Sequence, residues 1–199
     1  MGIDKEKQDI LIAIGTILLL IQGAEKAIRH CMTFVFQKDS PLTIEKLEAQ
    51  EKEEREKTLG YFISQLRHRA AIHPSFDVLL KTFLEDRNRF IHALSEINGF
   101  DIDSPEGRDV ANKFLSRLAF EAEKVTKYFV GFILTWSRNV GISYEAKLSE
   151  DENMQLLLIE KQYGSMIDDL LWEKKEQSQQ ASTDQGPAKK RAVQRKKGI

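Results

Sequence analysis

Apolar residues recur along the chain at intervals of three and four positions, the spacing that places them on one face of an α-helix. No segment shows the strict alternation of apolar and polar residues that is typical of a half-buried strand. The pattern predicts helices over residues 4–36, 43–72, 76–97, 105–139 and 149–175. We therefore expect an all-α protein, an antiparallel bundle of about four to five helices.

Capping residues indicate where these helices begin. Thr43 and Ser75 are suitable N-caps for the second and third predicted helices, and Ser104 followed by Pro105 predicts the start of the fourth. The fourth predicted helix would be roughly 50 Å long, and we expect it to bend or break near Gly131. Six apolar residues of the last predicted helix are expected to be buried: Met154, Leu157, Leu158, Ile167, Leu170 and Leu171.

The first predicted helix contains a continuous apolar run, Ile10–Ile21. At twelve residues this run is shorter than the ~20 that cross a bilayer, and Glu25, Lys26 and Arg29 follow it. We interpret it as a buried, central helix with neighbours on several sides, and expect no membrane contact. A membrane anchor formed by the same run is the alternative, which recovery of the whole protein in the soluble fraction would exclude.

Composition and charge divide the chain into a body and a tail. The 199 residues are 41% hydrophobic and 31% charged, which is typical of a globular protein with one domain. We expect that domain over residues 1–176 and a flexible tail over residues 177–199, whose net charge is +5 against −6 for the body. The tail residues that can contact an anionic partner such as nucleic acid are Lys189, Lys190, Arg191, Arg195, Lys196 and Lys197.

Several classes of chemistry lack their usual residues. Cys31 is the only cysteine, so no intrachain disulfide or CxxC site can form. His68 and His73 lack the i,i+4 spacing of a helical zinc pair. Phosphate-binding loops, dinucleotide fingerprints and serine-hydrolase elbows do not occur in the sequence. We expect no cofactor, no bound metal and a cytoplasmic location.

One arginine violates the helical pattern. In the stretch LEDRNRFIHAL, residues 84–94, Arg87 lies at the middle of an apolar stripe on a helical wheel. An unpaired guanidinium is costly to bury, so Arg87 needs a carboxylate, a set of carbonyls or a solvent-filled cleft. Asn88 and His92 lie together on one flank of the stripe. The three residues form one compact polar cluster within two helical turns.

The segment RNRFIH, Arg87 to His92, resembles the R-x4-6-H motif of the HEPN superfamily, in which a polar residue, commonly Asn, follows the arginine. HEPN domains are all-helical bundles about the size of residues 1–140, with the motif on an internal helix. The resemblance therefore implies a HEPN-like bundle with its motif-containing core over residues 1–140. The helix predicted over residues 149–176 would be an addition to that core.

The resemblance implies metal-independent cleavage of RNA, in which the ribose 2'-OH attacks the adjacent phosphodiester and leaves a cyclic phosphate and a free 5'-OH. His92 would act as general acid or base, a role that suits histidine near neutral pH. Arg87 would hold the phosphate and stabilise its developing charge. Asn88 would orient His92 or bind an oxygen. Such an enzyme would be a toxin, a stress effector or a phage-defence effector, with the tail lysines and arginines adding contacts to RNA.

Two partners are implied by the same resemblance. A homodimer formed through the motif-bearing helix would bring two motifs together, and an antitoxin or defence-system protein can accompany it. One branch of the family, the toxins paired with nucleotidyltransferase antitoxins, carries a tyrosine where this chain has Leu94, so silencing by modification of that tyrosine is not expected. The alternative function is a non-catalytic HEPN-like module that binds a protein or nucleic acid. A buried acidic partner for Arg87 in the same chain would favour this alternative.

Overall fold

The computed structural model describes residues 4–36, 43, 49, 52, 57–142 and 149–173. Helices dominate these residues, which confirms the predicted all-α bundle. The elements are α1 (Lys5–Phe34), α3 (Leu59–Arg69), β1 (Ala70–Ile72), α4 (Pro74–His92), η1 (Leu94–Glu96), α5 (Pro105–Asn139), α6 (Glu150–Tyr163), η3 (Gly164–Met166), α7 (Ile167–Leu170) and β2 (Leu171–Glu173). Most of residues 44–56 in the second predicted helix, and the whole basic tail with Lys189 to Lys197, lie outside the described residues.

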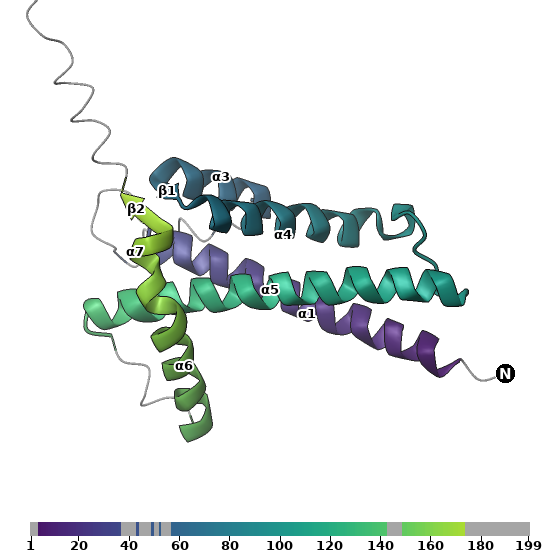
Figure 1. Ribbon diagram of the computed structural model, residues 1–199. Helices are drawn as coiled ribbons and strands as arrows, with labels where there is room; N and C mark the ends of the chain where they lie inside the picture. Colours follow the sequence, from purple (N-terminus) through teal and green to yellow (C-terminus); the bar gives the residue numbers. More distant parts are fainter. Residues whose placement is uncertain are drawn as a thin grey trace, which may run out of the picture.

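The two longest helices, α1 and α5, pack against each other and form the centre of the bundle (Figure 1). The hairpin of α3 and α4 lies over one side of this pair, with α3 against α1 and α4 against α5. Near its C-terminal end, α5 is crossed by α6. The chain directions of α1 and α4 are opposite, so the end of α4 that carries the motif lies along the middle of α1.

Large apolar side chains from α1, α4 and α5 fill the core. Phe83 of α4 and Phe129 and Phe132 of α5 have no accessible surface, and Phe76 packs against both α5 rings with centroids 5.9 and 6.0 Å apart. Burying one such ring contributes about 1.5–3 kcal/mol, so these contacts fix α4 on α5. The other fully buried large residues are Ile10, Ile21, Ile28, Met32, Ile63, Leu66, Leu80, Leu115 and Leu118.

Three helix boundaries differ from the predictions. The second predicted helix is not continuous, because Lys57 and Thr58 are non-helical and Thr58 caps the start of α3. The N-cap of α4 is His73 rather than Ser75, since the His73 ring accepts the Ser75 backbone N–H and Pro74 occupies the first helical position. The third predicted helix also stops at His92, and only a 3₁₀ turn follows over Leu94–Glu96.

Helix α5 does not break near Gly131, because it continues through this residue to Asn139. A Cβ at Gly131 would lie 2.9 Å from the Cβ of Tyr163, closer than side chains approach. The glycine therefore serves packing between helices, since it admits the end of α6 to the surface of α5.

The C-terminal part of the chain is more irregular than predicted. Helix α6 ends at Tyr163, and the chain continues through η3 and α7 to the short strand β2. Strand β2 pairs antiparallel with β1, with Ala70 opposite Glu173 and Ile72 opposite Leu171. Leu171 is buried and Ile167 and Leu170 are partly buried, as predicted. The predicted burial of the other three is wrong: the exposed fractions of Met154, Leu157 and Leu158 are 62%, 48% and 59%.

Helix α1 is less enclosed than predicted. Its isoleucines Ile10, Ile17, Ile21 and Ile28 face the core, but four other apolar side chains are exposed, which makes the prediction of neighbours on several sides wrong. By its length and composition the helix is apolar enough to cross a membrane. A core helix of a bundle can have the same length and composition.

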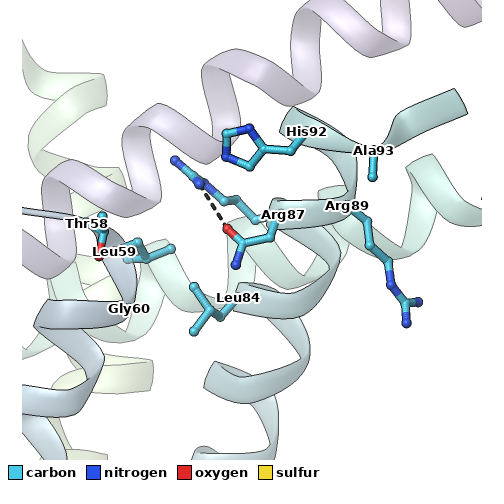
Figure 2. Close-up of a pocket in the computed structure, with 9 residues that line it drawn as sticks. Thr58, Leu59, Gly60, Leu84, Arg87, Arg89, His92 and Ala93 are labelled. Carbon is cyan, nitrogen blue, oxygen red and sulfur yellow. Dashed lines mark hydrogen bonds between the residues drawn. The ribbon is translucent and has the colours of Figure 1, made fainter. Parts of the chain in front are cut away.

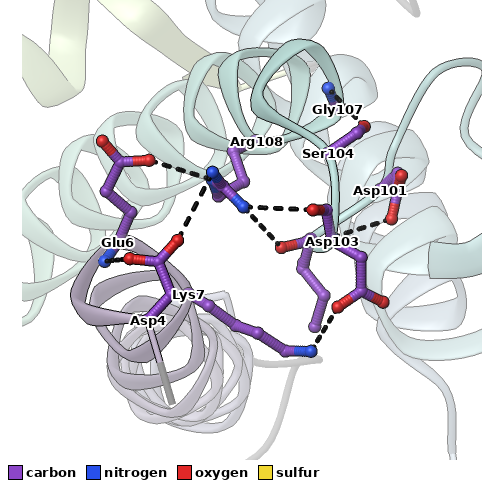
Figure 3. Close-up of polar contacts among 9 residues, drawn as sticks. Asp4, Glu6, Lys7, Asp101, Asp103, Ser104, Gly107 and Arg108 are labelled. Carbon is purple, nitrogen blue, oxygen red and sulfur yellow. Dashed lines mark hydrogen bonds and ion pairs between the residues drawn. The ribbon is translucent and has the colours of Figure 1, made fainter. Parts of the chain in front are cut away.

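A polar cluster fastens the start of α1 to the start of α5 (Figure 3). The Nε atom of Arg108 donates to Glu6 at 3.0 Å, and Nη2 lies 3.4 Å from a carboxylate oxygen of Asp4. The Nη1 atom donates to the carbonyls of Ile102 and Asp103, both at 3.3 Å. Because the Arg108 side chain is only 13% exposed, these contacts hold three chain segments at one point.

Candidate functional site

A pocket of about 500 Å³ lies between the C-terminal half of α4 and the first turn of α3 (Figure 2). It brings together the three motif residues Arg87, Asn88 and His92, which the sequence predicted as one cluster. Nine residues line the pocket: Thr58, Leu59, Gly60, Leu84, Arg87, Asn88, Arg89, His92 and Ala93.

The helical periodicity of α4 explains why the motif residues converge. His92 is one turn beyond Asn88, so both side chains lie above the same stretch of helix surface. Arg87 is partly buried beside them, and its Nη1 atom donates to the Asn88 side-chain oxygen at 3.0 Å. Asn88 and His92 are exposed, and His92 is the last residue of α4. The histidine therefore stands at the open side of the pocket, within reach of a bound molecule.

Arg87 has an acidic partner in its own chain. Its Nε atom donates to Oε1 of Glu25 in α1 at 2.7 Å, and the two side chains are 21% and 23% exposed. Glu25 lies beside the buried Ala24 and one turn before the buried Ile28, at the edge of the α1 face that packs into the bundle. The ion pair supplies the carboxylate that a partly buried guanidinium requires, without a second chain or a ligand.

The residue at the centre of the buried face of α4 is Asp86 rather than Arg87. Asp86 is 3% exposed, and its carboxylate accepts from Nε of Arg117 in α5 at 2.7 Å. The helical wheel placed Arg87 in the middle of the stripe, but the core contacts are made mainly towards α5, on the side of Asp86. Arg87 consequently lies at the edge of this face, turned towards α1.

A second buried carboxyl group, Glu121 of α5, lies near Asp86. Glu121 is 6% exposed, and its Oε2 atom has no hydrogen-bond partner among the described residues. Burial, followed by the negative charge of Asp86, raises the pKa of Glu121 to about 7, although Arg117 acts in the opposite direction. The interface between α4 and α5, directly behind the motif, therefore contains a group that gains or loses a proton near neutral pH.

The protonation of Glu121 predicts a pH-dependent stability. The folded protein binds this proton up to about pH 7, whereas a glutamate in the unfolded chain loses it near 4.5, so the free energy of unfolding falls as the pH rises between these values. Glu121→Gln removes the charge and should be more stable than the wild type at pH 8, by on the order of 2 kcal/mol, with little difference near pH 4.5.

Urea denaturation at both pH values measures this difference. Glu123→Gln is the matched control, because Glu123 is exposed on the same helix and pairs only at 3.4 Å with Lys127 among the described residues. An equal effect of Glu121→Gln at pH 4.5 and pH 8 would contradict the assignment of the proton to this group.

The wall of the pocket carries two guanidinium groups, those of Arg87 and Arg89, and none of the nine described lining residues is acidic. Arg89 is 62% exposed, its guanidinium lies 3.7 Å from the carboxylate of Asp86, and in Figure 2 it extends away from Arg87 and His92. The first turn of α3, at Leu59 and Gly60, also lines the pocket, and this end of a helix carries a partial positive charge. The pocket is therefore suited to an anion.

Other sequence candidates do not contribute to this pocket. Among the described residues, no group of three or more His, Cys, Asp or Glu side chains is placed to hold a metal ion. Cys31 is fully buried in the core, and burial raises the pKa of its thiol, so it is a poor nucleophile. His68 is exposed on α3 and His73 caps α4, and neither lines the pocket.

Comparison of the chain with models of protein families, with characterised proteins and with solved structures gave no match. The pocket, the ion pair and the charge of the surrounding wall are therefore the observations on which function can be argued.

Proposed function

We propose that the chain is a HEPN-like endoribonuclease whose pocket binds one phosphodiester of RNA. The observation that carries this proposal is the convergence of Arg87, Asn88 and His92 in one open pocket without acidic lining residues. A phosphate there can accept hydrogen bonds from the Arg87 guanidinium, whose charge stabilises the oxygens of the transition state. His92 can take the proton of the 2'-OH or give one to the departing 5' oxygen.

The ion pair with Glu25 supports a positioning role in this scheme. Glu25 occupies Nε of Arg87, and Asn88 occupies Nη1, so the guanidinium is held in one orientation beside the pocket. A fixed donor loses little entropy when a phosphate binds, and it does not need to reorganise during the reaction. A homodimer, an antitoxin partner and a toxin, stress or phage-defence role belong to the same proposal.

The proposal is tested by incubating the purified protein with a labelled RNA in the presence of EDTA. Fragments with a 2',3'-cyclic phosphate on one side of the cut and a free 5'-OH on the other are expected. A DNA strand of the same sequence lacks the 2'-OH and should remain intact. Cleavage that requires a divalent metal, or that occurs equally in DNA, would contradict the proposed chemistry.

A second candidate is the non-catalytic module that binds a protein or nucleic acid. The Arg87–Glu25 ion pair favours it, because it satisfies the arginine inside one chain and so accounts for Arg87 without any RNA. In this case Arg87 and Glu25 would serve mainly to hold α4 against α1. Their replacement would then change stability, and no RNA-cleaving activity would exist to be lost.

Glu25→Gln separates the two candidates. If Glu25 positions Arg87 for cleavage, the rate should fall roughly 10- to 100-fold, because a small displacement of a phosphate-binding group has an effect of this size. The unfolding free energy should change by only about 1 kcal/mol, since the pair is partly exposed.

The control for this experiment is Lys113→Ala, which removes an exposed ion pair with Asp109 on α5 and should alter neither quantity. A double-mutant cycle of Glu25→Gln with Arg87→Ala measures the coupling in both assays. If Glu25 and Arg87 are coupled in stability but the wild type cleaves no RNA, the non-catalytic candidate is the correct one.

A further inference from the structure

Helix α1 presents an apolar face that the described part of the bundle leaves uncovered. The four side chains on this face are Leu11, Ile12, Leu18 and Leu19, with exposed fractions of 43%, 58%, 39% and 68%. They form two pairs on the same side of the helix, one turn before and one turn after Gly15. Such a concentration of exposed apolar residues on one helix is typical of an interaction surface.

The surface at the middle of this face is flat. A Cβ built at Gly15 would meet no described atom within 4 Å, and the same is true of Gly23 two turns later. A partner helix can therefore approach the backbone of α1 closely at Gly15, with the two leucine and isoleucine pairs packing on either side of the contact.

We propose that this face binds the same face of a second copy of the chain, with the two α1 helices antiparallel and a two-fold axis passing at Gly15. The interface lies on α1 rather than on the motif-bearing helix α4, where the family resemblance implied it. The inference does not depend on the proposed function, because it concerns residues outside the pocket.

The distribution of charged and polar residues along α1 favours pairing with a second copy in the antiparallel orientation. When Gly15 lies opposite Gly15, the antiparallel arrangement places Leu11 opposite Leu19 and Ile12 opposite Leu18, so apolar residues meet apolar residues. The flanking positions at the centre of the face match in the same register, because Gln8 lies opposite Gln22 and Asp4 lies opposite Lys26. A parallel arrangement would instead place each charge opposite its own copy. The face is therefore self-complementary, as an isologous interface must be.

A lipid bilayer fits this surface less well. The opposite face of α1 is fixed in the core by Ile17, Ile21 and Ile28, so the helix cannot enter a membrane without leaving the bundle. The exposed face is bounded at both ends by charges of mixed sign, with Asp4 and Lys5 on one side and Lys26 on the other. A surface that binds anionic lipids carries an excess of basic residues instead.

The first test is the oligomeric state of the full chain, measured by sedimentation and light scattering at tens of micromolar. The wild type should be a dimer, and Leu19→Glu should be a monomer because it places two carboxylates in the apolar contact. Val78→Glu is the matched control, since Val78 is 63% exposed on the side of α4 opposite Arg87 and its replacement should leave the dimer intact. A monomeric wild type, or a dimer that survives Leu19→Glu, would overturn the proposal.

Cysteine cross-linking tests the orientation, with the native Cys31 buried and unreactive. Gly15→Cys should form a disulfide-linked dimer, because the axis brings the two positions together. Leu19→Cys alone should form none, since its two copies would be roughly 12 Å apart along the helices. A mixture of Leu11→Cys and Leu19→Cys chains should form the mixed dimer. Cross-linking of Leu19→Cys by itself would indicate parallel helices. Binding of the monomeric wild type to phosphatidylserine vesicles would indicate that the face binds a membrane. Either result would overturn the proposal.

Discussion

His92→Ala and Arg87→Ala should each lower the rate of RNA cleavage by roughly 10²- to 10⁴-fold while the protein stays folded. Each residue supplies a separate part of the proposed reaction, because His92 transfers a proton and Arg87 stabilises charge on the phosphate. Neither loss can be compensated within the described pocket, since His92 is its only histidine and Arg89 extends from a different side of α4. Single-turnover cleavage of a labelled RNA measures the rates, and circular dichroism monitors the fold.

Two further variants make this result specific. Arg87→Lys keeps a positive charge but loses the planar group that contacts Glu25 and that would bind the proposed phosphate, so it should recover only part of the lost rate. His68→Ala removes an exposed histidine of α3 that does not line the pocket and should cleave as fast as the wild type. Wild-type rates in both His92→Ala and Arg87→Ala would exclude the pocket as a catalytic site.

Gly107→Ala should destabilise the fold by about 3 kcal/mol, which corresponds to a fall in Tm of roughly 6–12 °C. A Cβ at Gly107 would lie 2.4 Å from the backbone oxygen of Asp101 and 2.8 Å from its Cα atom, so the backbone itself would have to move. Any such movement pulls on the loop that supplies two carbonyl acceptors to Arg108, and it disturbs the Ser104 cap that accepts the Gly107 N–H (Figure 3). The methyl group therefore affects the junction of α1 and α5 as a whole.

Thermal and urea denaturation measure this effect, with Gly23→Ala as the control. Gly23 is also a helical glycine, but a Cβ there meets no described atom within 4 Å. Its replacement should raise stability by about 0.5–1 kcal/mol, because alanine loses less backbone entropy in a helix. Equal effects of the two substitutions would show that close packing at Gly107 is not a determinant of stability.

Local signals predicted those parts of the fold that depend on neighbouring residues. Ser104 with Pro105 starts α5 as predicted, because an N-cap and a first-turn proline act on the N–H groups of the same turn. The burial of α6 could not be predicted in this way. Leu157 and Leu158 have helical spacing whether or not another element packs against them, and in this fold α6 turns that side to solvent. The strands β1 and β2 were missed because three residues are too few to show an alternating pattern.

For the candidate site, too, the sequence predicted only the contacts between residues that are close along the chain. Arg87, Asn88 and His92 lie within two turns of one helix, so helical geometry alone brings them together. Glu25 precedes Arg87 by 62 residues, and no periodicity relates two positions on different helices. Asp86 was also missed, because the wheel fixes the angle between Asp86 and Arg87 but not which of them faces α5 and which faces α1.

The pairing of β1 with β2 affects the order in which the protein folds during synthesis. Strand β1 joins α3 to α4, whereas its partner β2 lies about a hundred residues further along the chain. The α3–α4 hairpin can form early through local contacts, but its connecting strand can pair with β2 only after residues 171–173 have left the ribosome. The strand that leads into α4, the helix of Arg87 and His92, therefore pairs with the last described residues to be made.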